Sequence, residues 1–394
     1  MAIKYLKDLD FNGKCALIRV DYNVPYDKSM NITDDTRITA TLPTLTHCIE
    51  KGAKLVLISH LGRPDGKVVP KMSLKPVALR LSEVLKKDVK FIDSPIGDVV
   101  RDAIIAMKSG DVALLENIRF YPEEEKNDPG FGKFLASLGD VYIDDAFACA
   151  HRGHASNEAI THYIRECAAG TLLQDEIEYF NKAMLNPAKP TLALIGGVKV
   201  SSKIEVLKHI MDRVDYLVIG GAMAFTFLKA KGVPTGKSLV EETHVQTARD
   251  IMELAAKKNV EIVLPVDAVV AASLEDGANG KVVPIDQIPA DLAGYDVGPA
   301  SVELFKGIIA KSKTVVWNGP LGAFENGGFD AGTNGTAKAV AESGALSVIG
   351  GGDSVSAINR SGYASKMSYI STGGGAFLEM LEGKTLPAIA ALDR

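Results

Sequence analysis

The sequence has few cysteines, no basic excess and no long apolar run, and each of these absences excludes a class of protein. Its 394 residues include four cysteines, none of them in a CxxC pair, so free thiols in a reducing cytoplasm are predicted rather than a disulfide scaffold. No apolar run approaches the roughly 20 residues of a membrane span. The opening segment MAIKYLKDLDF lacks the apolar core of a signal peptide. We therefore expect a cytoplasmic protein without a membrane partner.

The net charge of −5 argues against nucleic acid as a partner, because proteins that bind polyanions usually carry an excess of basic residues. A hydrophobic content of 46% and a charged content of 24% are typical of folded proteins, and the length favours two domains. Eight of the twelve arginines precede residue 170, whereas glycine doublets and triplets crowd the second half. The two halves are therefore expected to bind different ligands.

Short apolar runs alternate with amphipathic helical patterns along the whole chain. Runs that are apolar on both faces and are separated by helices predict parallel sheets covered on both sides. We therefore predict an α/β protein with two doubly wound, Rossmann-like domains. The predicted strands are 15–20, 54–59, 111–116 and 140–144 in the first half, and 191–196, 216–220, 261–266, 314–317, 346–350 and 367–371 in the second.

The junction between the two halves is predicted to be helical. Residues 171–185 place Leu173, Ile177, Phe180 and Met184 at helical spacing, and the following NPAKP carries two prolines that end the pattern. We predict a first domain over 1–170, a hinge helix and linker over 171–188, a second domain over 189–379, and a cleft between the domains.

Arginine follows every predicted strand of the first half, at the sheet edge where open α/β sheets bind ligands. These residues are Arg37, Arg63, Arg119 and Arg152. One such arginine alone is better explained as a surface side chain, but guanidinium groups on four convergent loops suit carboxylate and phosphate. The same loops carry Asp21, Asn23, His60 and His154. The first half is thus predicted to bind a small, multiply charged anion.

Glycines and two lysines follow the predicted strands of the second half. Glycine allows a backbone to approach phosphate closely, and a following helix N-terminus adds donors and a positive dipole. A lone glycine pair more often permits a tight turn, but the repetition at equivalent strand ends favours a nucleotide site. Asp353 suits Mg²⁺ beside nucleotide oxygens, with a helix N-cap as the alternative. The residues of this predicted site are Lys199, Lys203, Gly220, Gly221, Asn318, Pro320, Glu325, Gly350, Gly351, Gly352, Asp353 and Ser354.

The segment GVPTGKS at 232–238 nearly matches the phosphate loop G-x-x-x-x-G-K-[ST], but it is one residue short. A phosphate loop follows a buried strand and opens a helix. Here the preceding AMAFTFLKAK has the spacing of a helix. We therefore predict a surface turn between helices at this segment and place the nucleotide elsewhere.

A series of motifs across the chain resembles the phosphoglycerate kinase family. In family order these are RVDYNVP, DDTRI, SHLGRP, NIRF, DAF-x-x-AHR, GG-x-KVSSK, GGAMAFTFLK, WNGPLGAFE, GGGDS and STGGGAFLE. The resemblance implies reversible phosphoryl transfer between 1,3-bisphosphoglycerate and MgADP, giving 3-phosphoglycerate and MgATP, by a monomer with Mg²⁺. It also implies that a tail of about 380–394 returns to the first domain. Val198 and Asp144 depart from residues that are frequent in the family.

The resemblance also implies a role for each matching site residue. Arg37, Lys199, Lys203 and Gly352 are expected to act on the transferred phosphoryl group, and Asp353 is expected to hold Mg²⁺. The acid is expected to bind Asp21, Asn23, Arg37, His60, Arg63, Arg119, Arg152 and His154. The nucleotide is expected to bind Lys203, Gly220, Gly221, Asn318, Pro320, Glu325, Gly350, Gly351, Gly352, Asp353 and Ser354.

The chemistry of this reaction requires no general base, because a carboxylate and a diphosphate oxygen are already ionised near neutral pH. We therefore interpret His60 and His154 as binding residues rather than bases. Alignment of the reactants and neutralisation of charge are what the transfer needs. With the acid and the nucleotide on different domains, reaction is expected to require domain closure, which also excludes water.

Three other functions share some of these sequence features. A nicotinamide-dependent dehydrogenase shares the fold, but G-x-G-x-x-G is absent from the strand–helix junctions. A two-domain solute-binding protein needs secretion and has no use for the lysine and aspartate set. A non-catalytic anion- and nucleotide-binding protein has the same architecture, and an assay of ATP formation separates it from the enzyme.

The near-match at 232–238 yields a prediction about two lysines. Lys237→Ala should change stability by no more than about 0.5 kcal/mol and leave activity near normal. Lys203→Ala should weaken transition-state stabilisation by roughly 3 kcal/mol because it removes a cation from the phosphate site. Steady-state kinetics with MgATP varied and circular dichroism check both variants. A crippled Lys237→Ala enzyme would show that the nucleotide site is wrongly placed.

Overall fold

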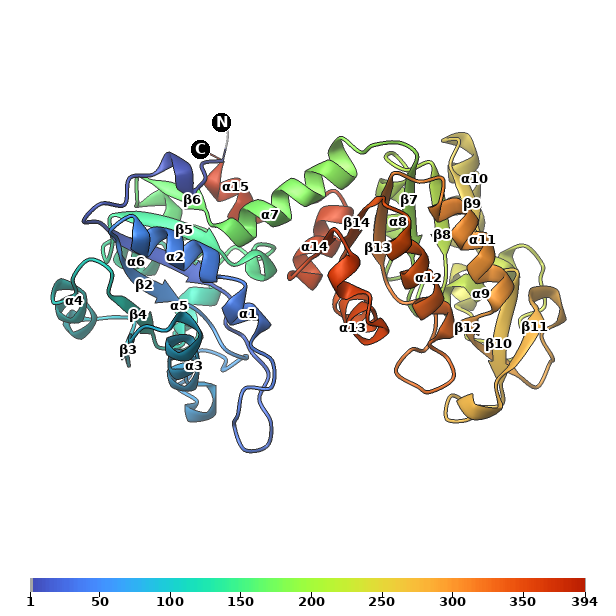
Figure 1. Cartoon of the computed structure of the whole chain (residues 1–394), viewed down its shortest axis with the longest axis horizontal. Coiled ribbons are helices and arrows are strands. Elements are labelled where there is room, and N and C mark those ends of the chain that lie inside the picture. Colours follow the sequence, from blue (N-terminus) through green and yellow to red (C-terminus); the bar gives the residue numbers. More distant parts are fainter. Residues whose placement is uncertain (1–2, 394) are drawn as a thin grey trace. The chain divides into compact units, whose positions relative to one another are not determined.

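The structure is a computed structural model that describes residues 3–393, and the chain folds as two compact units. The first unit comprises Met1–Ile177 and Thr385–Arg394, and the second comprises Glu178–Lys384. Helices flank the main sheet of each unit (Figure 1). Within residues 3–393, every helix is too short or too polar to cross a bilayer.

The first unit is built on a six-stranded sheet in which every pair of neighbours is parallel. From edge to edge the strands are β3 (Val89–Ile92), β4 (Val112–Leu115), β2 (Lys54–Ile58), β1 (Cys15–Val20), β5 (Val141–Asp145) and β6 (Cys167–Ala169). All six residues of β1 are buried, because a central parallel strand is covered on both faces. The four strands predicted for this half are confirmed.

Two edge strands of this sheet were not predicted. Only the two end residues of β3 are buried, so its apolar run is broken, and β6 has only three residues. Each of these strands is stabilised by pairing with its neighbouring strand, and the local composition does not reveal this stabilisation.

The helices of the first unit pack a continuous apolar core against this sheet. The C-terminal helix α15, red in Figure 1, lies beside β6, and Ala388 N donates to Ala150 O at 3.2 Å. The helices are α1 (Thr36–Thr39), α2 (Leu42–Glu50), α3 (Lys75–Leu85), α4 (Asp98–Ile105), α5 (Pro122–Glu125), α6 (Pro129–Ala136), α7 (Thr171–Phe180), which extends past this unit's boundary at Ile177, and α15 (Pro387–Leu392).

The second unit contains another six-stranded parallel sheet. Its strands are β15 (Tyr369–Ile370), β14 (Leu346–Ile349), β13 (Thr314–Asn318), β7 (Thr191–Ile195), β8 (Tyr216–Ile219) and β9 (Glu261–Val263). Chain order runs outward in both directions from the β7–β13 pair, so these two strands form the topological switch point where doubly wound sheets bind ligands. The parallel sheets confirm the predicted fold class.

Two further predictions about helices are confirmed. The predicted helical stripe at the junction forms α7 and the π-helical turn Asn181–Leu185, with its four apolar residues buried. The segment 232–238 follows α9 rather than a strand and precedes α10, as predicted for a surface turn. The helices of the second unit are α8 (Ile204–Ile210), α9 (Met223–Ala230), α10 (Val245–Lys257), α11 (Pro299–Ile309), α12 (Ala331–Glu342), α13 (Gly352–Ser361) and α14 (Gly374–Leu381).

A small antiparallel sheet in the second unit was not predicted. It consists of β11 (Lys281–Pro284), β10 (Asp267–Ala271) and β12 (Ala293–Val297). Phe225 and Leu228 of α9 pack on β10 to form a separate apolar cluster. The three strands contain glycine, proline and charged residues, which disfavour strands locally, so the covering helix rather than their composition stabilises them.

Asp145 fixes the start of α7 in the first unit. It is the last residue of β5, and its Oδ1 accepts from the backbone N–H of Leu172 at 2.9 Å and of Leu173 at 3.2 Å. A carboxylate in this position satisfies N–H groups that have no partner within the helix. Burial nevertheless raises the pKa of Asp145 to about 7, because the interior disfavours the ionised form.

This raised pKa predicts how stability depends on pH. The native protein retains a proton that the unfolded chain, with an aspartate pKa near 3.9, has lost. The stability contributed by protonation is complete below the unfolded pKa and is lost as pH rises through 7. Between pH 5 and 8, the free energy of unfolding of the wild type should fall by about 2–3 kcal/mol relative to Asp145→Asn.

Denaturant titrations at several pH values measure this difference. Asp102→Asn, which neutralises an exposed carboxylate on α4, is the matched control. It retains Asp145, so its free energy of unfolding should fall with pH in parallel with that of the wild type. A difference between wild type and Asp145→Asn that stays constant from pH 5 to 8 contradicts the prediction.

Candidate functional site

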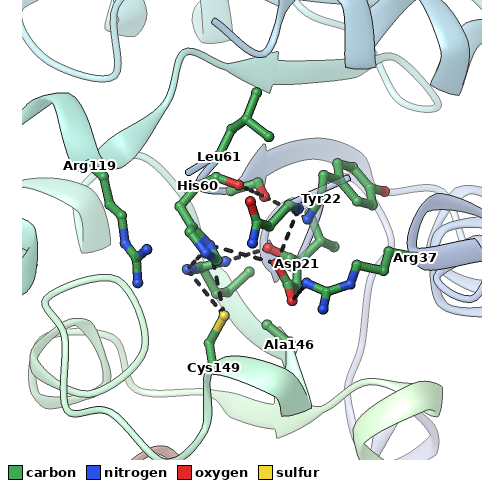
Figure 2. Close-up of polar contacts among 12 residues, drawn as sticks. Asp21, Tyr22, Arg37, His60, Leu61, Arg119, Ala146 and Cys149 are labelled. Carbon is green, nitrogen blue, oxygen red and sulfur yellow. Dashed lines mark hydrogen bonds and ion pairs between the residues drawn. The ribbon is translucent and has the colours of Figure 1, made fainter. Parts of the chain in front are cut away.

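The carboxyl ends of the central strands in the first unit bring the predicted acid-binding side chains together. Asp21 follows β1, His60 follows β2, and Arg119 lies in the 3-10 turn Ile118–Phe120 after β4. The turn Phe147–Cys149 follows β5. Figure 2 shows these side chains around one centre, with Asp21 between Arg37 and His60.

Asp21 organises one side of this cluster. Its Oδ2 forms an ion pair with Arg37 Nη1, and its Oδ1 lies 3.7 Å from His60 Nδ1. The same Oδ1 accepts from the backbone N–H of Asn23 at 3.2 Å. Asn23 in turn accepts from Gly62 N at 2.9 Å. Asp21 and Asn23 therefore hold the loops after β1 and β2 together.

Arg19 lies at the centre of the cluster, although the sequence did not single it out as a site residue. Its side chain is fully buried, and it donates from Nε to Ser156 Oγ at 2.8 Å and from Nη1 to the Val20 carbonyl. Its Nη2 lies 3.3 Å from His60 Nδ1. The signal was present in the sequence, because one charged residue interrupts the apolar run CALIRV.

Three potential metal ligands meet at the same place. One donor atom each from Asp21, His60 and Cys149 lie within 4.8 Å of one another. However, Arg19 Nη2 is 3.8 Å from Cys149 Sγ and 3.3 Å from His60 Nδ1. A positively charged guanidinium group therefore already contacts two of the three potential metal ligands. The cluster is therefore better suited to an anion than to a metal ion.

The histidines of the cluster are held in the neutral form. Burial, with Arg19 and the other arginines around it, lowers the pKa of His60 well below its ordinary value. Burial and the same arginines lower the pKa of His154 to about 3. Because Arg19 donates toward His60 Nδ1, the remaining proton of this ring belongs on Nε2. Both histidines can thus act as hydrogen-bonding groups without adding charge.

Arg119 carries a donor that the protein leaves unpaired. The residue is 3% exposed, its Nη1 donates to Gly62 O at 2.9 Å, and its Nε lies 3.3 Å from Glu125 Oε1. Within residues 3–393, its Nη2 is buried and has no hydrogen-bond partner. Burial and the nearby Arg19 lower the pKa of Arg119. An unpaired buried donor is costly, and an anion bound here would satisfy it.

The other predicted acid-site residues differ in exposure. Arg152 is partly buried, and its Nε donates to His151 Nε2 at 3.2 Å. Arg63 is exposed on the loop after β2. His154 is buried, and its backbone N–H donates to Asn157 Oδ1 at 2.8 Å. Asp144, a departure from the family pattern, is buried on β5 in register with Arg19, and burial raises its pKa to about 6.

The switch point of the second unit brings the loops after β7, β13 and β14 together. Lys203 Nζ donates to Asn318 Oδ1, and Asn318 Nδ2 donates to Gly350 O at 2.7 Å. Ser354 Oγ accepts from Gly319 N at 2.6 Å. Burial lowers the pKa of Lys203. These bonds place one lysine, one asparagine and the start of α13 side by side.

The remaining residues of the predicted nucleotide site differ in exposure. Pro320 is partly buried beside Asn318. Val198, which departs from the family pattern, is 58% exposed, so its side chain is largely in solvent. The residues that stand exposed to solvent at the ends of the sheet are Lys199, Glu325, Gly352 and Asp353.

The structure explains most of the glycines by contacts with protein rather than with ligand. A Cβ on Gly220 would lie 2.4 Å from Leu321, and one on Gly350 would lie 2.0 Å from the Phe377 ring. Gly221 has a φ of +67° and would bring a Cβ within 2.5 Å of Gly197 O. Gly351 has a φ of +99° at the start of α13. Gly352 differs, because a Cβ there would meet open space.

Two doubly wound units, one with a cluster of arginines and neutral histidines and the other with a lysine and an asparagine at its switch point, define a class of two-unit α/β proteins. Comparison with known proteins narrows this class. The phosphoglycerate kinase family model matches residues 6–384. The phosphoglycerate kinase of Syntrophobacter fumaroxidans is 53% identical over 391 residues, covering 99% of this chain and 98% of that protein.

Solved structures agree with the sequence relatives. A phosphoglycerate kinase from Coxiella burnetii is 42% identical with a TM-score of 0.92, covering 100% of this chain and 99% of that one. A phosphoglycerate kinase from Pyrococcus horikoshii OT3 is 33% identical with a TM-score of 0.84, covering 99% of this chain and 98% of that one. The chain belongs to the phosphoglycerate kinase family. It is a phosphotransferase with a carboxyl group as acceptor.

The glycine contacts predict opposite effects for two substitutions. Gly221→Ala should destabilise the protein by more than about 2 kcal/mol, because the new Cβ meets the Gly197 carbonyl in a left-handed conformation. Gly352→Ala should leave the fold intact and raise the KM for MgATP, because its Cβ projects into open space at the switch point. Thermal unfolding and kinetics on both variants decide this, and an unstable Gly352→Ala or a fully stable Gly221→Ala would contradict it.

Proposed function

We propose how this chain carries out the reaction of its family, the reversible transfer of a phosphoryl group between 1,3-bisphosphoglycerate and MgADP that yields 3-phosphoglycerate and MgATP in glycolysis and gluconeogenesis. The first unit binds the acid, and the second unit binds the nucleotide. The observation that carries this assignment is the buried, unpaired Nη2 of Arg119 within a cluster of arginines and neutral histidines. Such a site is incomplete until an anion occupies it.

The acid is held by charge and by shape. Arg119 and Arg152 supply donors for its phosphate and carboxylate oxygens, and Asn23 and His60 supply neutral hydrogen bonds. Arg63 adds a cation from the exposed loop after β2. Neutral histidines suit this role because they leave the charge of the site to groups that do not titrate near pH 7.

Arg37 is assigned to the transferred phosphoryl group. Its side chain is 37% exposed, and Asp21 holds it from one side through an ion pair. One edge of the guanidinium therefore remains available to a ligand. A fixed cation at this position stabilises charge on the phosphoryl oxygens during transfer without a reorganisation step.

The nucleotide is assigned to the switch point of the second unit. Lys203, already oriented by Asn318, and the exposed Lys199 balance the negative charge of the phosphates. Gly352 opens α13 without a side chain, so its amide and the following turn can approach a phosphate oxygen. Ser354 is buried against Gly319 and fixes this turn, Pro320 borders the bound nucleotide, and the exposed Glu325 meets the ribose.

Mg²⁺ is proposed as the ion that accompanies the nucleotide. Mg²⁺ typically takes one or two carboxylates together with phosphate oxygens and water. Asp353 fits this preference, because it is exposed in the first turn of α13 beside the open Gly352. When bound, the ion neutralises charge on the phosphates. Asp353 orients it, while Lys199 and Lys203 contribute fixed positive charge.

Transfer in this site requires no proton acceptor. The attacking carboxylate or diphosphate oxygen is ionised at neutral pH, and the low pKa of His60 and of His154 removes them as acids at that pH. We further propose that the protein is a monomer and works in the cytoplasm. A coupled assay of ATP formation from 1,3-bisphosphoglycerate and ADP tests the activity. Binding of both ligands without turnover would instead favour a non-catalytic anion- and nucleotide-binding protein.

Arg37→Ala is predicted to lower turnover by about 10²–10³-fold while the affinity for nucleotide changes little. The reason is that Arg37 belongs to the acid-binding unit and meets the phosphoryl group only during transfer. Arg101→Ala, which removes a half-exposed arginine on α4, is the control and should retain activity. An unchanged kcat in Arg37→Ala would exclude this role.

A further inference from the structure

Glu124 is a fully buried carboxylate beneath the acid-binding cluster, and neither the sequence motifs nor the proposed mechanism accounts for it. It belongs to the short helix α5. The next residue of this helix, Glu125, forms an ion pair with Arg119. Burial raises the pKa of Glu124, and the nearby Arg19 opposes this shift. A buried carboxylate is retained only where its charge and its lone pairs are satisfied.

Ser156 satisfies both oxygens of this carboxylate. Its hydroxyl donates to Glu124 Oε1 at 2.6 Å, and its backbone N–H donates to Oε2 at 2.9 Å. The backbone carbonyl of Glu124 also accepts from Ala155 N at 3.0 Å. These bonds attach α5 to the segment 154–156, which carries His154.

The same hydroxyl connects Glu124 to Arg19. Ser156 Oγ accepts from Arg19 Nε at 2.8 Å while it donates to the carboxylate, so a buried cation and a buried anion are joined through one hydroxyl. The far side of the guanidinium faces His60 Nδ1 at 3.3 Å. On the near side, Glu124 Oε1 lies 3.7 Å from His154 Nδ1. The network thus ends at two residues assigned to the acid site.

We propose that Glu124 is a positioning residue for the acid site, which holds Arg19 and the segment 154–156 through Ser156 and thereby fixes His60 and His154. It does not touch the substrate. This inference rests on the proposed function, because its consequence is the affinity for the three-carbon phosphorylated acid. Glu125 acts in parallel on Arg119 from the same short helix.

A positioning role and a purely electrostatic role predict opposite changes in the affinity for the acid when Glu124 is replaced. A negative charge near an anion site weakens anion binding through space, so its removal alone should strengthen the binding of the acid. Loss of positioning should weaken that binding, because Arg19 loses its buried counter-charge and the two histidines lose their common support. The sign of the change therefore separates the two roles.

The test is Glu124→Gln, which keeps the side-chain volume but removes the charge. The amide has one acceptor oxygen, so it can accept only one of the two hydrogen bonds that Ser156 donates to Glu124. The KM for 3-phosphoglycerate should rise by about tenfold or more, the size of change expected when one charge-assisted hydrogen bond is lost. The KM for MgATP should stay within about twofold, because its assigned site is on the other unit. Glu123→Gln, an exposed carboxylate on the same helix, is the matched control and should change neither constant.

A second variant keeps the inference testable if Glu124→Gln does not fold. Ser156→Ala removes the hydroxyl that joins the two charges but retains both of them, and it should also raise the KM for 3-phosphoglycerate selectively. In the double variant the two effects should be less than additive, because both remove the same connection. Thermal unfolding by circular dichroism establishes which variants are folded.

The outcomes are distinct. A KM for 3-phosphoglycerate that falls or stays constant in the folded variants overturns the positioning role, and so does an equal rise in the KM for both substrates. If the wild-type protein shows no turnover with 3-phosphoglycerate and MgATP, the proposed function fails instead. Calorimetric titration of 3-phosphoglycerate then decides the role of Glu124, with weaker binding by the variants supporting it and unchanged binding overturning it.

Discussion

The buried guanidinium of Arg19 is the constraint on which the polar cluster of the first unit depends. A charge removed from water costs many kilocalories per mole unless protein groups replace its hydration. Burial disfavours the charged form of Arg19, but Cys149, Glu124 and Asp21 outweigh this effect and raise its pKa. The loops after β1, β2 and β5 must therefore keep their polar groups close to one strand position, and the cluster of Asp21, His60 and Cys149 is assembled around that position.

This arrangement supports the role proposed for the cluster in the transfer of a charged group. Its histidines are neutral, and the arginines are fixed by carboxylates at one edge: Asp21 contacts Arg37, and Glu125 contacts Arg119. Arg119 Nη1 also donates to Gly62 O, whereas its Nη2 has no hydrogen-bond partner within residues 3–393. Charge stabilisation is consequently present before the ligand arrives, which is the contribution that phosphoryl transfer most requires from a protein.

In the second unit, the packing of the backbone fixes the geometry of the loops at the switch point. At the switch point between β7 and β13, a Cβ on Gly196 would lie 2.0 Å from Pro320 O, and one on Gly319 would lie 2.1 Å from Gly196 O. Two loops can pass this closely only without side chains. Glycine here serves the packing of the loops on one another, and the orientation of Lys203 and Asn318 follows from that packing.

Much of the fold could be predicted from the sequence, because β1, β7 and their neighbours are apolar on both faces and such runs have few alternatives to central parallel strands. The parallel order in turn brought the arginine-bearing loops to one edge, so membership of the acid cluster was predictable for Arg37 and Arg119. The strands β10 and β12 were not, because contact with α9 rather than local composition stabilises them. Arg19 and Glu124 were missed for a related reason. The partner of a charged residue in an apolar run or an acidic turn cannot be identified until segments distant in sequence pack together. Burial decides the charge and the role of such a residue, and burial is a property of that packing.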